Sequence, residues 1–139
     1  MRVLGIDPGL HITGYGILES SDSELRLVEA GIIKTNPKDS MEQRLLEVGR
    51  EMAGVISQFQ PDAMAIEELY SHYTHPRTAI IMGHARGVVC CKAAEAGVAV
   101  RPYAATRIKK SLTGNGRATK EQVQQMIKST LGLNDQSHD

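Results

Sequence analysis

The sequence predicts one α/β domain with a mixed five-stranded sheet and helices on both of its faces. Three β-like runs come first, at 2–6, 13–20 and 24–35, and their short connections favour an antiparallel meander. After Asn36-Pro37 the apolar period changes, and helical segments alternate with short apolar runs, as in crossovers between parallel strands. The length, 139 residues of which 41% are hydrophobic, is that of a single domain with a real core.

The second part of the chain supplies the helices and the last two strands. Apolar residues three and four apart predict an amphipathic helix over 41–58, which Pro61 ends. A helix nearly apolar all round is predicted to begin after Pro76; we expect it to be buried, with close contacts on the side of Gly83 and Gly87. This helix is predicted to span 77–96. The remaining predicted elements are strands at 62–69 and 97–103, a short basic helix at 104–112 and a last helix at about 119–131.

Charge is distributed unevenly although the formal net charge is zero. Residues 1–76 hold 6 Lys/Arg and 12 Asp/Glu, whereas residues 77–139 hold 10 Lys/Arg and 4 Asp/Glu. Such asymmetry favours one surface for a polyanion and another rich in carboxylates, although two ordinary solvated faces would look the same.

The sequence contains no apolar run of transmembrane length and no signal-peptide pattern, so we expect a cytoplasmic protein that does not enter a membrane. Cys90 and Cys91 are adjacent within an apolar segment, and we interpret them as reduced core residues.

Carboxylates follow two of the predicted strands. Asp7 ends the first, and Glu67-Glu68 end the fourth. If the crossover places these strands side by side, the carboxylates meet at the carboxyl ends of parallel strands, where α/β sheets bind ligands. Paired oxygen ligands suit Mg²⁺ or Mn²⁺ and phosphodiester hydrolysis, and alternation along the strand lets only one of the two glutamates face the site. The alternative is structural, because Asp before Pro-Gly is also a common turn.

Two loops invite other interpretations. "YSHYTHPRT" (70–78) contains His72 and His75, a weak metal pair, and fits better as a loop whose aromatic rings stack on unpaired bases. "TGNGRATK" (113–120) resembles a phosphate-binding loop but lacks the complete pattern and the preceding strand, so its glycines favour a turn that presents Arg117 and Lys120 to DNA phosphates.

Six short blocks in order resemble the RuvC family of Holliday-junction resolvases: "GIDPG", "TGYG", "AIEELY", "ARGVV", "KKSLTGNG" and "ATKEQV". The resemblance runs from residue 2 to about 133. It implies a ribonuclease-H-like fold over residues 1–139, a homodimer, and a nuclease that makes paired symmetrical nicks in four-way DNA junctions during recombination and repair. It also implies Mg²⁺ as the cofactor, with Mn²⁺ as a substitute, and the RuvA-RuvB branch-migration complex as a partner.

The resemblance implies roles for individual residues. Asp7 and Glu67 match metal-binding catalytic carboxylates, which leaves Glu68 outside the site. Tyr70 matches an aromatic that enters the junction, and Lys109 and Lys120 match basic residues that bind DNA. Asp139 matches a third catalytic metal ligand, with His138 as its alternative. The family's last aspartate is absent, so we expect a chain that lacks its final helix.

Two other classes of function remain open on the sequence. A junction-binding module without catalysis would explain the missing ligand. A nucleotide-binding domain of the sugar-kinase and actin type also begins with an Asp-bearing strand and hairpin, but it needs a second phosphate hairpin and a longer chain.

Overall fold

The computed structural model describes residues 1–21, 24–68 and 75–103. Within these ranges every predicted element is confirmed to within two residues at each end. The elements are β1 (Arg2–Asp7), β2 (Ile12–Ser21), β3 (Glu24–Lys34), α1 (Met41–Phe59), β4 (Ala63–Glu67), α2 (Pro76–Glu95) and β5 (Ala99–Tyr103). The helices predicted at 104–112 and 119–131 lie outside the described residues.

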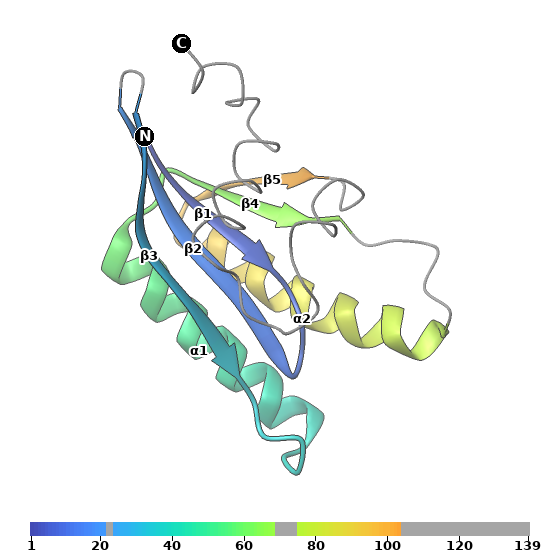
Figure 1. Cartoon of the computed structure of the whole chain (residues 1–139). Coiled ribbons are helices and arrows are strands. Elements are labelled where there is room, and N and C mark those ends of the chain that lie inside the picture. Colours follow the sequence, from blue (N-terminus) through green and yellow to red (C-terminus); the bar gives the residue numbers. More distant parts are fainter. Residues whose placement is uncertain (22–23, 69–74, 104–139) are drawn as a thin grey trace.

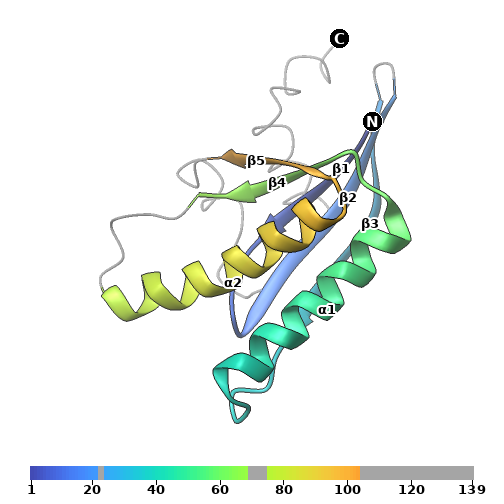
Figure 2. The same ribbon diagram turned by 180° about the vertical axis from the view of Figure 1, so that it is seen from behind.

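The five strands form one mixed sheet in the order β3-β2-β1-β4-β5. β1, β2 and β3 are the predicted antiparallel meander, while β1, β4 and β5 run parallel to one another. Both described helices, α1 and α2, cover the same face of the sheet (Figures 1 and 2). The helix that the sequence predicts on the opposite face is not among the described residues.

The core lies between the sheet and the two described helices. Leu4 and Ile6 of β1 point into it, and alternation therefore turns Val3, Gly5 and Asp7 toward the opposite face. The core side chains are aliphatic, as the scarcity of aromatic residues requires: Leu4, Ile6, Ile17, Ile33, Val48, Met52, Val55, Ile56, Met64, Ile66, Val89, Ala93 and Val98.

Helix α1 has clear end signals. Ser40 accepts a hydrogen bond from the Gln43 backbone N–H, and the Gln43 side chain accepts one from the Ser40 N–H, which is a capping box. At the other end Gln60 adopts a left-handed conformation and Pro61 follows, so the helix cannot continue.

The prediction that the helix at 77–96 is buried all round is wrong within this chain. In α2 only Ala85, Val89 and Ala93 are buried, because a single stripe of the helix faces the sheet. The interpretation of both cysteines as core residues is therefore wrong for Cys91, which is exposed, whereas Cys90 is partly buried against the core. The opposite stripe is exposed, and a Cβ added to Gly87 would meet nothing within 4 Å. The apolar composition of α2 therefore reflects two faces, one of which has no partner among the described residues.

Arg2 joins three elements at the amino end of β1. Its Nε donates to the Glu19 carboxylate (2.7 Å) and an Nη donates to the Phe59 carbonyl (2.7 Å). Its backbone N–H donates to the Asp62 carboxylate (2.8 Å). These contacts lie at the end of the strand that is remote from Asp7. No helix in the described ranges is long and apolar enough to cross a membrane.

Candidate active site

Asp7 and Glu67 end two neighbouring parallel strands, as the sequence predicts. Ile6 is aligned with Ile66 in the β1–β4 ladder, and each carboxylate residue is the next along its strand. Aligned residues of parallel strands project to the same face, so both side chains lie on the face opposite α1 and α2. The arrowheads of β1, β4 and β5 point to this common edge in Figure 1.

The two adjacent glutamates differ as strand alternation requires. Glu67 is the last residue of β4 and its side chain is buried, at 6% exposure, whereas Glu68 lies just beyond the strand and is exposed. A buried carboxylate beside a second carboxylate is costly unless a cation or hydrogen-bond donors compensate its charge. This donor set therefore fits a hard divalent cation such as Mg²⁺ or Mn²⁺. Among the described residues no third His, Cys, Asp or Glu completes a metal cluster with them.

The chain turns sharply after Asp7, and a buried hydroxyl closes the turn. Thr13 Oγ1 accepts a hydrogen bond from the Gly9 N–H (3.2 Å) and donates one to the Gly9 carbonyl (2.6 Å). The Thr13 side chain is fully buried. A Cβ on Gly9 would overlap the carbonyl oxygen of Ile12, so this turn accepts only glycine at position 9 without a backbone shift.

A second threonine, Thr35, follows the last residue of β3 and supports the same turn. Thr35 Oγ1 donates to the Leu10 carbonyl (2.6 Å) and accepts from Arg44 Nε (3.0 Å), while the Thr35 N–H donates to the His11 carbonyl (3.1 Å). Thr35 is 6% exposed. Contacts from β2, β3 and α1 thus fix the backbone that follows Asp7.

The strand end at Glu67 is held differently. Arg86 of α2 donates from Nε to the main-chain carbonyl of Glu67 (3.1 Å), across a sequence separation of 19 residues. The β1–β4 ladder ends one residue earlier, at Ile66, while the β4–β5 ladder pairs Glu67 with Tyr103. A side chain therefore contributes to fixing the backbone of the residue that carries the second carboxylate.

Known proteins share both this fold and the sequence that builds the site. The family model described as "Crossover junction endodeoxyribonuclease RuvC" matches residues 3–139. The chain belongs to the RuvC family. A relative of that name from Rhodopirellula baltica is 50% identical over 131 residues, covering 94% of this chain and 74% of the relative. One from Caldicellulosiruptor saccharolyticus is 44% identical, covering 97% and 81%.

A solved structure extends the similarity to three dimensions. The structure entitled "T. thermophilus RuvC in complex with Holliday junction substrate" has a TM-score of 0.74 at 31% identity and covers 96% of this chain and 81% of that one. The predicted ribonuclease-H-like α/β class and the predicted crossover junction endodeoxyribonuclease activity are thereby confirmed.

The RuvC-type site is described only in part. Asp7 and Glu67 lie together, whereas Tyr70, Lys109, Arg117, Lys120, His138 and Asp139 lie outside the described residues. Arg101, which the sequence reasoning did not select, is exposed and aligned with Ala65, two residues before Glu67, so it lies on the same face as the carboxylates.

Sequence reasoning also missed the residues that hold the site, although their signals were present. Thr13 opens the "TGYG" block four residues after Gly9, and Arg86 lies inside "ARGVV". Both blocks identified the family, but neither revealed which backbone atoms these side chains contact.

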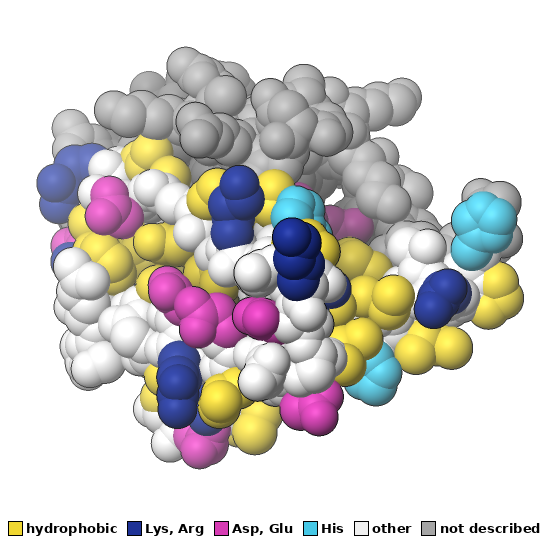
Figure 3. Space-filling model, turned by 90° about the horizontal axis from the view of Figure 1, so that it is seen from below, with side chains coloured by type: hydrophobic (Ala, Val, Ile, Leu, Met, Phe, Trp, Pro, Cys, Tyr) yellow, Lys and Arg dark blue, Asp and Glu magenta, His cyan; other side chains and the backbone are white. Residues whose placement is uncertain are grey.

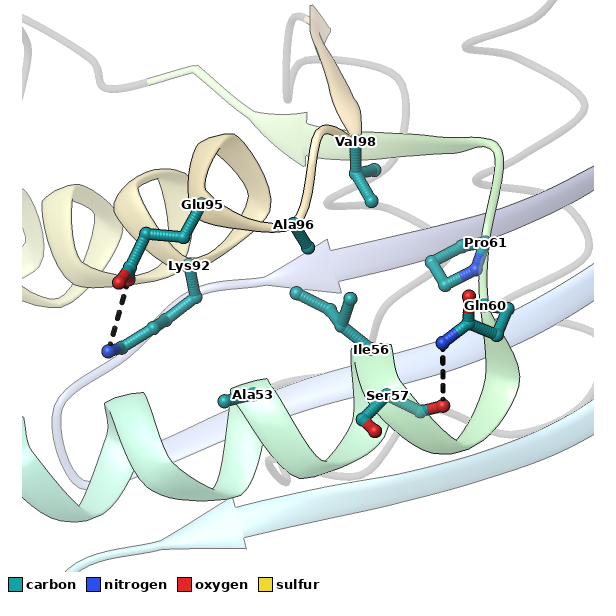
Figure 4. Close-up of a pocket in the computed structure, with 9 residues that line it drawn as sticks. All are labelled: Ala53, Ile56, Ser57, Gln60, Pro61, Lys92, Glu95, Ala96 and Val98. Carbon is teal, nitrogen blue, oxygen red and sulfur yellow. Dashed lines mark hydrogen bonds and ion pairs between the residues drawn. The ribbon is translucent and has the colours of Figure 1, made fainter.

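A cavity of about 440 Å³ lies at the opposite end of this RuvC-family domain, between the carboxyl ends of α1 and α2. Three of its polar side chains are engaged with protein atoms: Lys92 pairs with Glu95 at 3.1 Å, and Gln60 Nε2 donates to the Ser57 carbonyl at 2.9 Å (Figure 4). It lies away from the carboxylates and presents no convergent set of buried polar groups that would orient a ligand.

Proposed function

We propose that this chain resolves four-way DNA junctions by metal-dependent cleavage of two opposing strands during recombination and repair. The observation that carries the proposal is the pair Asp7 and Glu67, on one face at the carboxyl ends of adjacent parallel strands, in a chain of the RuvC family. A relative of known structure is described in complex with a Holliday junction. The junction-binding module without catalysis is less well supported, because such a module has no need of two carboxylates, one of them buried, at the ends of adjacent strands.

Asp7 and Glu67 would hold Mg²⁺, with Mn²⁺ as a substitute, and Asp139 or His138 would complete the ligand set. When bound, the metal would supply activation of the attacking water and neutralisation of charge at the scissile phosphate. The protein would hold both ligands in place before the metal binds. The Glu67 carboxylate is buried, and the turn closed by Thr13 fixes the direction of Asp7.

A cleavage assay on a synthetic four-way junction tests the proposal, with linear duplex of the same sequence as the substrate control. We expect paired nicks in Mg²⁺ that Asp7→Asn and Glu67→Gln abolish, while gel shifts in Ca²⁺ show that junction binding survives. Glu68→Gln is the matched control and should be mild, since Glu68 is exposed beyond β4. An active Glu67→Gln protein beside a dead Glu68→Gln protein would contradict the assignment.

DNA binding would rest on the basic part of the chain. We propose that Lys109, Arg117 and Lys120 contact phosphates and that Tyr70 enters the junction. If Lys109 and Lys120 each neutralise one phosphate, replacing either with alanine should reduce the slope of log K against log salt by about one unit. Unchanged slopes in both variants would place the DNA elsewhere.

The enzyme would act as a homodimer through α2. Ile80, His84, Gly87 and Cys91 are exposed and follow one another at intervals of four, three and four, on the side of α2 opposite its buried stripe. Ile80 is 60% exposed, and hydrophobic side chains gather on the projecting amino-terminal half of α2 (Figure 3). Two symmetrical nicks need two active sites, which a two-fold axis supplies.

Sedimentation of charged variants tests this interface. Ile80→Glu should yield monomers that still bind metal but no longer make paired nicks. Leu46→Glu is the control, because Leu46 of α1 is similarly exposed, at 52%, but lies outside the proposed interface. A dimeric Ile80→Glu protein would exclude α2 as the contact.

Membership of the RuvC family also suggests a cellular compartment and a partner complex. We propose a cytoplasmic enzyme, in line with its two free cysteines, which functions with the RuvA-RuvB branch-migration complex. Co-sedimentation with purified RuvA-RuvB on a junction, compared with the junction alone, tests the partnership.

A further inference from the structure

Arg86 contacts the peptide group of Glu67 from the other side of the sheet. The guanidinium comes from α2, which covers the face opposite the carboxylates, and the acceptor is the main-chain oxygen of Glu67 (3.1 Å). Because the acceptor is the main-chain oxygen, this hydrogen bond does not use the carboxylate. The contact can therefore orient Glu67 without competing for the oxygens that would hold metal.

The backbone at this point has little support from the sheet on the β1 side. The β1–β4 ladder ends at Ile6 and Ile66, so Glu67 lies beyond its last aligned pair. The base of Arg86 is firmly placed, since its neighbour Ala85 and the residues one and two turns further, Val89 and Ala93, are buried against the sheet. A rigid helix thus offers a donor to the end of the strand.

We propose that Arg86 is a positioning residue for metal binding: through the Glu67 carbonyl it fixes the direction of the Glu67 carboxylate. The inference rests on the proposed role of Glu67 as a metal ligand. Groups that orient metal ligands commonly change metal affinity tenfold or more when they are removed. Arginine suits the task because its planar guanidinium holds Nε in a fixed direction, whereas the ammonium of lysine is a mobile point donor.

A purely structural role is the competing explanation, in which the bond merely ties α2 to β4. That role predicts loss of thermal stability and of junction binding in proportion to loss of cleavage. A positioning role instead changes the metal requirement while the fold and the junction affinity remain.

The experiment uses the full chain with Arg86→Met, which keeps an unbranched side chain but removes every donor. Lys92→Met is the matched control. Lys92 is on the same helix and is partly buried, but it pairs with Glu95 in the last turn of α2, away from Glu67. Four quantities are measured: Mn²⁺ affinity by the spin-resonance signal of free Mn²⁺, half-saturating Mg²⁺ for junction cleavage, junction affinity in Ca²⁺, and thermal midpoint.

We expect Arg86→Met to weaken Mn²⁺ binding and to raise half-saturating Mg²⁺ by about tenfold, with junction affinity within about twofold of the parent. Arg86→Lys should restore part of the metal affinity, and Lys92→Met should leave it unchanged. Unchanged Mn²⁺ affinity in a folded Arg86→Met protein overturns the proposal. If Arg86→Met does not fold, Arg86→Leu, which also lacks a donor, takes its place; failure of both to fold establishes the structural role instead.

The two proposals fail separately. If Glu67→Gln retains Mn²⁺ binding and cleavage, Glu67 is not a metal ligand and the proposed site is wrong. If Glu67→Gln loses both while Arg86→Met retains both, the site is correct and only the role of Arg86 is refuted.

Discussion

The strand ends at Asp7 and Glu67 carry equivalent carboxylates but are built in different ways. After Asp7 the chain makes a tight turn closed by Thr13, four residues from Gly9, and supported by Thr35. At Glu67 the supporting side chain is Arg86, 19 residues away on a helix. One half of the site is therefore fixed chiefly by a local turn, and the other by packing of a helix against the sheet.

Substitutions in the two halves should therefore affect different properties of the protein. A change in the turn after Asp7 disturbs buried hydrogen bonds and should reduce both stability and cleavage. A change at Arg86 removes one partly buried contact and should act first on metal affinity.

The largest effect is expected for Gly9→Ala. The new Cβ would overlap the Ile12 carbonyl oxygen, so the turn must shift and Asp7 must move with it. A displacement of this kind lowers cleavage by on the order of 100-fold, measured as single-turnover rate on a four-way junction.

Gly54→Ala is the matched control for that change. Gly54 lies within α1, and an added Cβ meets nothing within 4 Å. The variant should cleave normally and gain about 0.5–1 kcal/mol in free energy of unfolding from improved helix propensity. Normal cleavage by Gly9→Ala would show that the turn tolerates a shift without moving Asp7.

A smaller effect on the same half is expected for Thr13→Val. The substitution keeps the shape but removes the hydroxyl that serves both the N–H and the carbonyl of Gly9, at a buried position. Leaving these groups without that partner should cost about 1–3 kcal/mol of unfolding free energy, measured by denaturant titration.

Thr13→Ser retains the hydroxyl and serves as the rescue. It should recover most of the hydrogen-bond contribution, with a small loss for the missing methyl group. Equal destabilisation of Thr13→Val and Thr13→Ser would mean that packing, rather than the hydroxyl, closes the turn. In contrast to Arg86→Met, neither variant should selectively change Mn²⁺ affinity.

The sequence predicted the part of the candidate site that follows from strand periodicity and parallel pairing. A strand ending in Asp-Pro-Gly, and a second acidic strand end after a crossover, placed both carboxylates correctly because strand periodicity and parallel pairing are simple rules. The contacts of Arg86 and Thr35 could not be predicted, since they depend on how far a helix or a strand end lies from a particular carbonyl.

Helix α2 shows a second limit of sequence reasoning. Its nearly uniform apolar character predicted burial, but burial requires a partner as well as a composition. The sheet covers only the stripe of Ala85, Val89 and Ala93, and the exposed stripe remains for another surface. Composition alone cannot distinguish a helix buried within one chain from one covered by a second copy.

The smallest effect is expected at the end of the sheet remote from both carboxylates. The hydrogen bond from Arg2 is the largest cause of the lowered pKa of Glu19. Desolvation opposes it, and the charges of Arg2, Arg26 and the amino terminus lower this pKa further. Since the folded-state pKa is depressed, this pair stabilises the protein above the ordinary glutamate pKa of 4.5, and the contribution is lost as the pH falls through the folded-state value.

Glu19→Gln should therefore make the free energy of unfolding less dependent on pH below 4.5 and leave junction cleavage at neutral pH unchanged. Denaturant titrations across this acid range, compared with the parent, measure the first effect, and single-turnover cleavage measures the second. The Arg2–Glu19 pair is about one-third exposed on each side, so solvent screening keeps the change small. A loss of cleavage as large as that of Gly9→Ala would show that the two ends of β1 are coupled, and the position of Asp7 would then depend on the whole strand rather than on its own turn.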